Sequence, residues 1–131
     1  QRTLRAMDRL GLWTPWGPRA GQPYPAHEKS LLSRLAGIPG YHDDGVWLWQ
    51  SALALRVLAA LGRQAPLERM TAGVVGLVLA EGAAGEVYDP VTGRPLSGRL
   101  YRAESPFTWS SAMLLEAFRE LLKRVPCPSP S

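Results

Sequence analysis

Residues 46–61 read VWLWQSALALRVLAAL, which is the most apolar stretch of the chain. Only Gln50, Ser51 and Arg56 interrupt it, so a helix formed here has apolar side chains on nearly every side. A helix at the surface of a small protein usually has one apolar stripe, whereas a helix that is apolar all round is buried. We therefore expect a helix over 46–61 that packs on more than one side and ends at Gly62.

A second helix of this kind is expected at about 66–81. Pro66 suits its first turn, and Gly82 suits its end. Its apolar residues again occupy most sides, and Gly73 and Gly76 allow another backbone to approach closely. Two consecutive helices of this type are hard to bury in a small bundle, and they fit better in a double-layered helical assembly.

The remaining elements are also helical. We expect helices over 2–10, 27–36 and 107–124, the last one capped by Ser105 or Thr108. The last helix has a single apolar stripe formed by Leu114, Phe118, Leu121 and Val125. Glycine and proline crowd residues 11–45 and 82–106, which predicts loops there, with a short hairpin around 91–93. No segment alternates as a strand would, so the predicted fold class is all-α.

The composition sets bounds on the protein class. The chain has 131 residues, of which 46% are apolar and 20% charged, as in a globular domain. The sequence has no uninterrupted run of 18 apolar residues, so it predicts no membrane-spanning helix. A lone cysteine, Cys127, excludes an internal disulfide and a site built from several thiolates. The net charge is +4, but the arginines are scattered, so nucleic acid is not an expected partner. We expect a cytoplasmic protein.

The domain organisation follows from the two all-round apolar helices. We expect residues 1–125 to form a single partial domain and residues 126–131 to form a flexible tail. The chain starts at Gln1, without Met and without an apolar signal segment. We therefore expect Gln1 to be a cut point within a longer chain.

The loop before the first apolar helix carries side chains that a simple connector does not need: Tyr41, His42, Asp43, Asp44, Trp47 and Trp49. Asp44 has a plain structural alternative as a helix cap. Carboxylates beside tryptophans also suit a sugar, because acids bind its hydroxyls and an indole covers its C–H face. One His with two adjacent Asp is a weak metal signal, so no metal site is expected.

Two further loops carry polar and aromatic residues. In residues 85–93, turn formation explains Asp89 but not Glu86, which is a candidate general base beside Tyr88. In residues 103–112, Trp109 is expected in the core or at a pocket. Glu104 is expected to pair with Arg99 or Arg102 at the surface.

Together the three loops resemble segments of the (α/α)6-barrel glycoside hydrolases, the group of trehalases, processing α-glucosidases, mannosylglycerate hydrolases and the glucosidase module of glycogen debranching enzymes. The segment YHDDGVWLW (41–49) is similar to the group's Tyr-His-Asn-Gly-x-Val-Trp-Pro-Trp loop. EVYDPVTG (86–93) resembles its Glu-x-Tyr-Asp-Pro-x-Thr-Gly segment, and PFTWSSA (106–112) resembles its closing Phe-x-Trp-Ser-Ala-Ala segment. The three segments occur in the same order and span about residues 35–122.

The resemblance implies part of an (α/α)6 toroid and an inverting mechanism, in which one carboxylic acid protonates the leaving oxygen and a carboxylate activates water. It assigns the base to Glu86 and the sugar pocket to Tyr41, His42, Asp43, Asp44, Trp47, Trp49, Tyr88 and Trp109. It implies a carbohydrate ligand, glucoside-like, and no cofactor. The group's general acid lies on an upstream loop, and residues 1–34 hold no matching motif; Asp8, in an arginine-rich helix, is a poor candidate.

Two departures from the group's pattern concern the first loop. Asp43-Asp44-Gly45 stands where Asn-Gly is commoner, and Leu48 replaces a proline. Both departures lie in the loop that matches the lining of the group's sugar subsite.

Two alternatives belong to other functional classes. The chain is alternatively a non-catalytic helical module that binds a carbohydrate or serves as an interaction surface. Its apolar helices would then need a partner chain to cover them, most simply a second copy of the same chain. In the barrel hypothesis, the missing N-terminal part of the barrel covers them instead. Binding of nucleic acid through the arginines is the third hypothesis, and salt-sensitive retention on heparin would be its signature.

Overall fold

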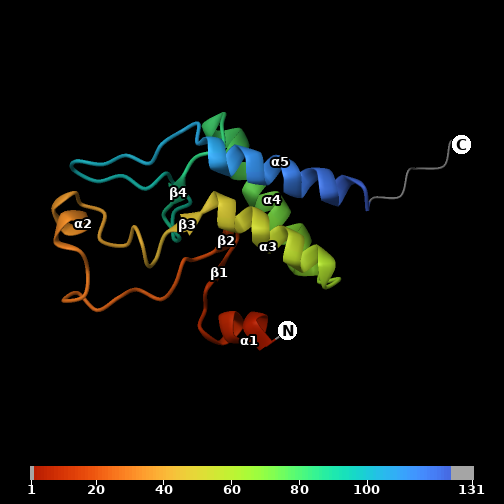
Figure 1. Ribbon diagram of the computed structural model, residues 1–131, viewed down its shortest axis with the longest axis horizontal. Coiled ribbons are helices and arrows are strands. Elements are labelled where there is room, and N and C mark those ends of the chain that lie inside the picture. The colour runs from red at the N-terminus through yellow and green to blue at the C-terminus, as the bar shows by residue number, and fades with distance from the viewer. Residues whose placement is uncertain (1, 125–131) are drawn as a thin grey trace, which may run out of the picture.

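The computed structural model describes residues 2–124, and its regular structure is mostly helical. Its five helices are α1 (Arg2–Arg9), α2 (Leu31–Leu35), α3 (Leu48–Ala60), α4 (Gln64–Glu81) and α5 (Thr108–Leu122). Helices α3, α4 and α5 gather on one side of the molecule, and long loops extend from them to the opposite end (Figure 1). The predicted tail at 126–131, together with Val125 and Cys127, lies outside the described residues.

Four very short strands accompany the helices. Strands β1 (Trp13–Thr14) and β2 (Gly17–Pro18) form one antiparallel pair, and β3 (Val46–Trp47) and β4 (Val87–Tyr88) form another. The hairpin predicted around 91–93 is present as an antiparallel bridge between Tyr88 and Pro95, but none of the four strands was predicted, and β3 occupies the expected start of the helix over 46–61. Each strand has only two residues, which is too short to produce a recognisable alternation of apolar and polar side chains.

Helix α3 is the centre of the core. It packs against α4, α5 and β2, which agrees with the predicted burial on more than one side. Its buried residues are Leu48, Ser51, Ala52, Leu55 and Leu58. However, Leu53 and Val57 on α3 and Leu61 directly after it form an exposed stripe, at 40%, 45% and 42% exposure. The described residues therefore cover only part of the apolar surface of α3.

Helix α4 approaches the β1–β2 hairpin through a glycine. A side chain at Gly73 would overlap the backbone carbonyl of Pro15, so no larger residue fits there without displacing the hairpin. Gly76, one turn later, faces open space. Gly82 ends the helix as predicted, in the left-handed conformation.

Several predicted details of the helix ends are wrong. Asp44 does not cap α3, and neither Ser105 nor Thr108 caps α5; the residues before these helices are Trp47 and Phe107, and neither makes a side-chain cap. Helix α2 has only five residues and buries none of its leucines. Ser110, one turn before Leu114 on α5, is fully buried although it is polar.

None of the helices formed by residues 2–124 is long and apolar enough to cross a membrane.

Candidate active site

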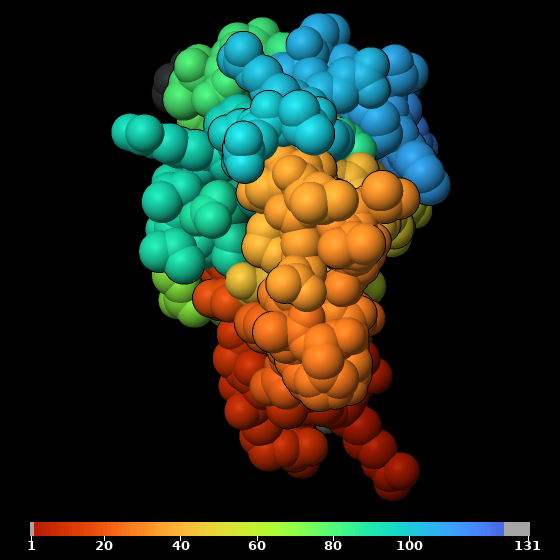
Figure 2. Space-filling model, turned by 90° about the vertical axis from the view of Figure 1, so that its left-hand side faces the viewer, coloured from red at the N-terminus to blue at the C-terminus, as the bar shows by residue number. Residues whose placement is uncertain are grey.

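The three loops singled out by the sequence meet at one end of the helical core. The β3–β4 pairing places Trp47 opposite Val87, and the Leu48 N–H donates to the Glu86 carbonyl. On the other side, the Glu86 N–H donates to the Glu104 carbonyl at 2.9 Å. Figure 2 looks at this end of the molecule, where residues before α3 (orange) and residues before α5 (cyan) lie side by side. Backbone pairing on both sides therefore fixes the position of Glu86.

The carboxylate of Glu86 is the polar centre of this cluster. It accepts a hydrogen bond from the Tyr41 hydroxyl at 2.7 Å on one oxygen. Its other oxygen accepts from the Tyr101 hydroxyl and from the Glu104 N–H at 3.2 Å. Because an ionised carboxylate has about four acceptor positions, one remains for a further donor such as a water molecule. Glu86 is half-buried, so part of the residue is accessible to solvent.

Aromatic rings pack around Tyr41, one of the two tyrosines that bind the carboxylate. Tyr41 makes edge-to-face contacts with His42, Trp47 and Tyr101, with ring centroids 4.7, 4.9 and 5.1 Å apart. Of these side chains, only His42 is largely exposed. The sequence predicted Tyr41, His42 and Trp47 for the site, and the structure packs His42 and Trp47 against Tyr41, whose hydroxyl binds Glu86.

The tyrosines of the cluster are held in their neutral form. Burial and the hydrogen bond to Glu86 raise the pKa of Tyr41, although its contact with Tyr101 opposes this shift. Burial and the bond to Glu86 raise the pKa of Tyr101 far above its usual range. A neutral hydroxyl donates a proton to a carboxylate, so both tyrosines act as donors that position Glu86.

A tyrosine titration tests this arrangement. The chain has four tyrosines, and burial also raises the pKa of Tyr88. At pH near 10, the ordinary tyrosine pKa, the folded chain should show less than about half the tyrosinate absorbance of the urea-unfolded chain.

The raised tyrosine pKa values also predict how the stability of the fold depends on pH. Above pH 10 the folded state holds more protons than the unfolded state, so the free energy of unfolding should fall as the pH rises through and beyond 10. Equal titration of the folded and unfolded chains would contradict the cluster. Glu86→Gln should bring the pKa values of Tyr41 and Tyr101 down.

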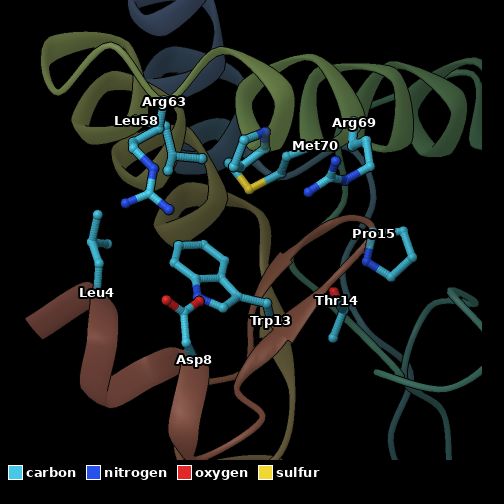
Figure 3. A pocket seen from close by; sticks show the side chains of 10 residues that line it. Leu4, Asp8, Trp13, Thr14, Pro15, Leu58, Arg63, Arg69 and Met70 are labelled. Carbon is cyan, nitrogen blue, oxygen red and sulfur yellow. The ribbon is translucent and has the colours of Figure 1, made fainter.

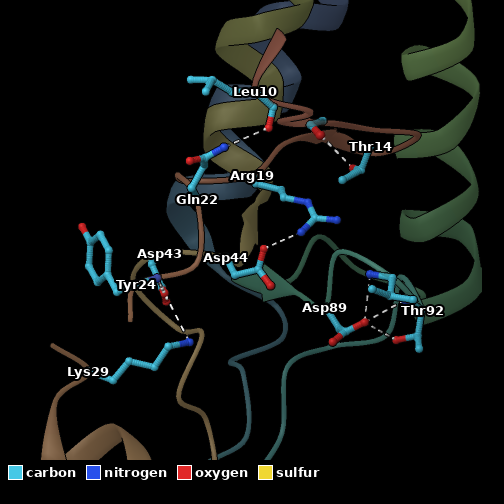
Figure 4. A network of polar contacts seen from close by, with 12 residues as sticks. Leu10, Thr14, Arg19, Gln22, Tyr24, Lys29, Asp43, Asp44, Asp89 and Thr92 are labelled. Atoms are coloured by element: carbon cyan, nitrogen blue, oxygen red, sulfur yellow. Dashed lines mark hydrogen bonds and ion pairs between the residues drawn. The ribbon is translucent and has the colours of Figure 1, made fainter. Parts of the chain in front are cut away.

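The two aspartates of the first loop are engaged in ion pairs. Asp44 binds Arg19 at 2.7 Å. Asp43 is buried, with 1% of its side chain exposed; it accepts a hydrogen bond from the Tyr24 N–H and lies 3.3 Å from the Lys29 ammonium (Figure 4). Both carboxylates therefore fasten residues 19–29 to the site loop, and that of Asp43 is not presented to a ligand.

Asp89 and Tyr88 also have structural partners. One carboxylate oxygen of Asp89 accepts hydrogen bonds from the Val91 N–H and from the N–H and hydroxyl of Thr92, which is the predicted turn (Figure 4). Burial alone would raise the pKa of Asp89, but the bonds from Thr92 and Val91 and the charge of Arg19 lower it. Tyr88 is fully buried, and its hydroxyl accepts from the Gly85 N–H at 3.0 Å. Tyr88 is therefore a core residue, and its hydrogen bond with Gly85 stabilises the loop that carries Glu86.

Trp49 and Trp109 form a separate pair at the start of α3 and α5. Their rings are stacked, with centroids 5.0 Å apart and planes 11° from parallel. Trp109 is 56% exposed, so it is not a core residue. The pair presents an aromatic surface to the outside.

Sequence reasoning missed Tyr101, Arg19 and Lys29. Tyr101 lies among the scattered basic residues of a glycine-rich loop, and no spacing or motif marks it. Its position depends on the pairing of residues 96–103, in which Ser97 bridges Arg102 and the Gly98 N–H donates to the Tyr101 carbonyl. The predicted surface pair of Glu104 with Arg99 or Arg102 is not among the ion pairs of residues 2–124.

Within residues 2–124, no group of three or more His, Cys, Asp or Glu side chains is placed to hold a metal ion.

No protein-family model matches the chain, and no curated protein and no solved structure matches it. The glycoside hydrolase family therefore stays a prediction from the three sequence motifs.

Proposed function

We propose that this chain is the base-bearing segment of an inverting glycoside hydrolase of the (α/α)6-barrel type, with Glu86 as the general base. The observation that carries the proposal is the position of the Glu86 carboxylate. Three loops with sugar-site motifs meet there, two tyrosine hydroxyls and a backbone N–H hold the carboxylate, and one of its acceptor positions is left for a water molecule.

Glu86 would remove a proton from the water that attacks the anomeric carbon. A base must be held in a fixed orientation, because proton transfer requires hydrogen-bond geometry. Tyr41, Tyr101 and the Glu104 N–H provide that orientation. Trp47, which packs against Tyr41, offers an apolar surface for a sugar ring.

The second carboxyl group of the mechanism, the general acid, is not assigned to this cluster. In an inverting enzyme the acid stands about 6.5–9.5 Å from the base, on the other side of the sugar. Asp43 and Asp44 are engaged with Lys29 and Arg19, which makes them unsuitable as proton donors. The resemblance assigns the acid to an upstream barrel loop, so we expect residues 1–131 alone not to hydrolyse ordinary α-glucosides.

Exposed apolar helix faces favour a larger helical assembly. Besides the stripe on α3, Val75 and Leu79 on α4 and Leu115 and Leu122 on α5 are exposed, Leu79 by 76%. In a helical barrel, neighbouring hairpins would cover such faces. The same faces would serve the alternative, a self-associating module, and strictly monomeric sedimentation of the chain would count against that alternative.

Binding of a charged sugar mimic tests the proposal. 1-Deoxynojirimycin has the shape of glucose and carries a cationic ring nitrogen, which should pair with the Glu86 carboxylate. Calorimetry should show saturable binding to the wild-type chain and at least about tenfold weaker binding to Glu86→Gln. Glu104→Gln is the matched control, since the exposed Glu104 contacts Glu86 through its backbone N–H and carbonyl and not through its side chain. Equal affinities of the wild type and Glu86→Gln would contradict the proposal.

A further inference from the structure

A cleft of about 450 Å³ lies between α1 and α4, on a different set of residues from the cluster around Glu86. Strand β1 forms one side of it, and α3 closes the interior end. Its volume lies within the range of small-molecule sites, which are mostly apolar with a few polar groups. The cleft is therefore large enough for a ligand of one or two rings.

The interior of the cleft is apolar and aromatic. Leu4 and Met70 form opposite sides and are almost fully buried. The half-buried indole of Trp13 stands between them, with its ring directed into the cleft (Figure 3). Flat apolar rings pack well against indole and thioether groups.

Two guanidinium groups lie on the α4 side. Arg63 precedes α4, Arg69 lies on its second turn, and both side chains extend toward the cleft (Figure 3). Neither takes part in an ion pair among residues 2–124. Arginine is well suited to bind carboxylates, because its planar fork donates two parallel hydrogen bonds.

One acidic group faces them across the cleft. Asp8 extends from α1 toward Trp13, so the cleft carries two positive charges on one side and a single negative charge on the other (Figure 3). Among the charged residues that line the cleft, this asymmetry would draw an anionic group toward Arg63 and Arg69 and away from Asp8. Charge and shape together define both the class of ligand and its orientation.

We propose that this cleft binds a small aromatic carboxylate, with the carboxylate on the α4 side, where Arg63 and Arg69 supply the positive charge, and the ring against Trp13 and Met70. The ring occupies the apolar interior, and the charged end stays at the mouth of the cleft. This assignment does not depend on the role of Glu86. The two sites use different residues, so each can fail without the other.

The probe for this site is 1-naphthoate, followed by calorimetry and by quenching of tryptophan fluorescence. We expect saturable binding to the wild-type chain, and at least tenfold weaker binding of the uncharged isostere 1-naphthylmethanol. The double variant Arg63→Gln/Arg69→Gln should bind naphthoate at least tenfold more weakly than the wild type. The matched control is Arg34→Gln/Arg99→Gln, which removes the same charge from two exposed arginines outside the cleft and should leave binding unchanged.

Asp8→Asn gives a readout in the opposite direction. Removal of the single negative charge should tighten naphthoate binding, an effect that partial unfolding does not produce. The proposal is overturned if naphthoate does not saturate the wild-type chain, if naphthylmethanol binds as tightly, or if the two double variants bind equally well. It is also overturned if Asp8→Asn weakens binding while the variant keeps the wild-type circular dichroism.

Discussion

Glu86→Gln should slow the hydrolysis of α-D-glucosyl fluoride by this chain by about 10²–10⁴-fold, the usual contribution of a general base. Fluoride leaves without protonation, so this substrate needs the base but not the general acid. In the proposed step, the water oxygen forms a bond to the anomeric carbon, the C–F bond breaks, and the water proton moves to the Glu86 carboxylate. A glutamine amide cannot accept that proton. A fluoride electrode measures the rate.

Two controls accompany this measurement. Glu104→Gln should retain the wild-type rate, and methyl α-D-glucoside should not be cleaved, because its methoxide leaving group needs an acid. Proton NMR should show β-glucose as the first product, since water attacks from the face opposite the fluoride. Release of α-glucose first, or an unchanged rate in Glu86→Gln, would contradict the assigned role.

Gly73→Ala should lower the free energy of unfolding by about 1–3 kcal/mol. The added methyl group would overlap the Pro15 carbonyl, so the β1–β2 hairpin must move away from α4. The hairpin backbone cannot yield in the way that the end of a flexible side chain can. Urea unfolding, followed by circular dichroism, measures the change.

Gly76→Ala is the matched control on the same helix. A methyl group there meets nothing within 4 Å. Alanine is a better helix former than glycine, so this variant should gain about 0.5–1 kcal/mol. Opposite signs for two identical substitutions three residues apart would identify the contact with Pro15 as the cause. Stabilisation by both variants would show that α4 and the hairpin do not pack as described.

The helices were predictable because their signals are local. The apolar run of 46–61 and the glycines at 62 and 82 predicted α3 and α4 and their ends to within a few residues. Short strands such as β3 and β4 were not predictable. They exist because Val46–Trp47 meets Val87–Tyr88 across the fold, and no single segment carries that information. The (α/α)6 toroid that the resemblance implies is part of the proposed function.

The site was predictable in part. Motifs identified Glu86, Tyr41 and Trp47, and the structure places them together. What each side chain faces depends on long-range packing, so the burial of Asp43 by residues 24–29 and the contact of Tyr101 with Glu86 were not visible. A carboxylate in a loop has the same sequence signature whether it binds a lysine or a sugar.

The central claim is that the cluster around Glu86 is a sugar site. A titration of the isotope-labelled chain with 1-deoxynojirimycin, followed through backbone amide chemical shifts, tests this most directly. The account predicts saturable shifts centred on residues 85–88, 41–47 and 101–104, and their loss in Glu86→Gln. Absence of saturable shifts there, or shifts centred on Trp13, Arg63 and Arg69 instead, would contradict it.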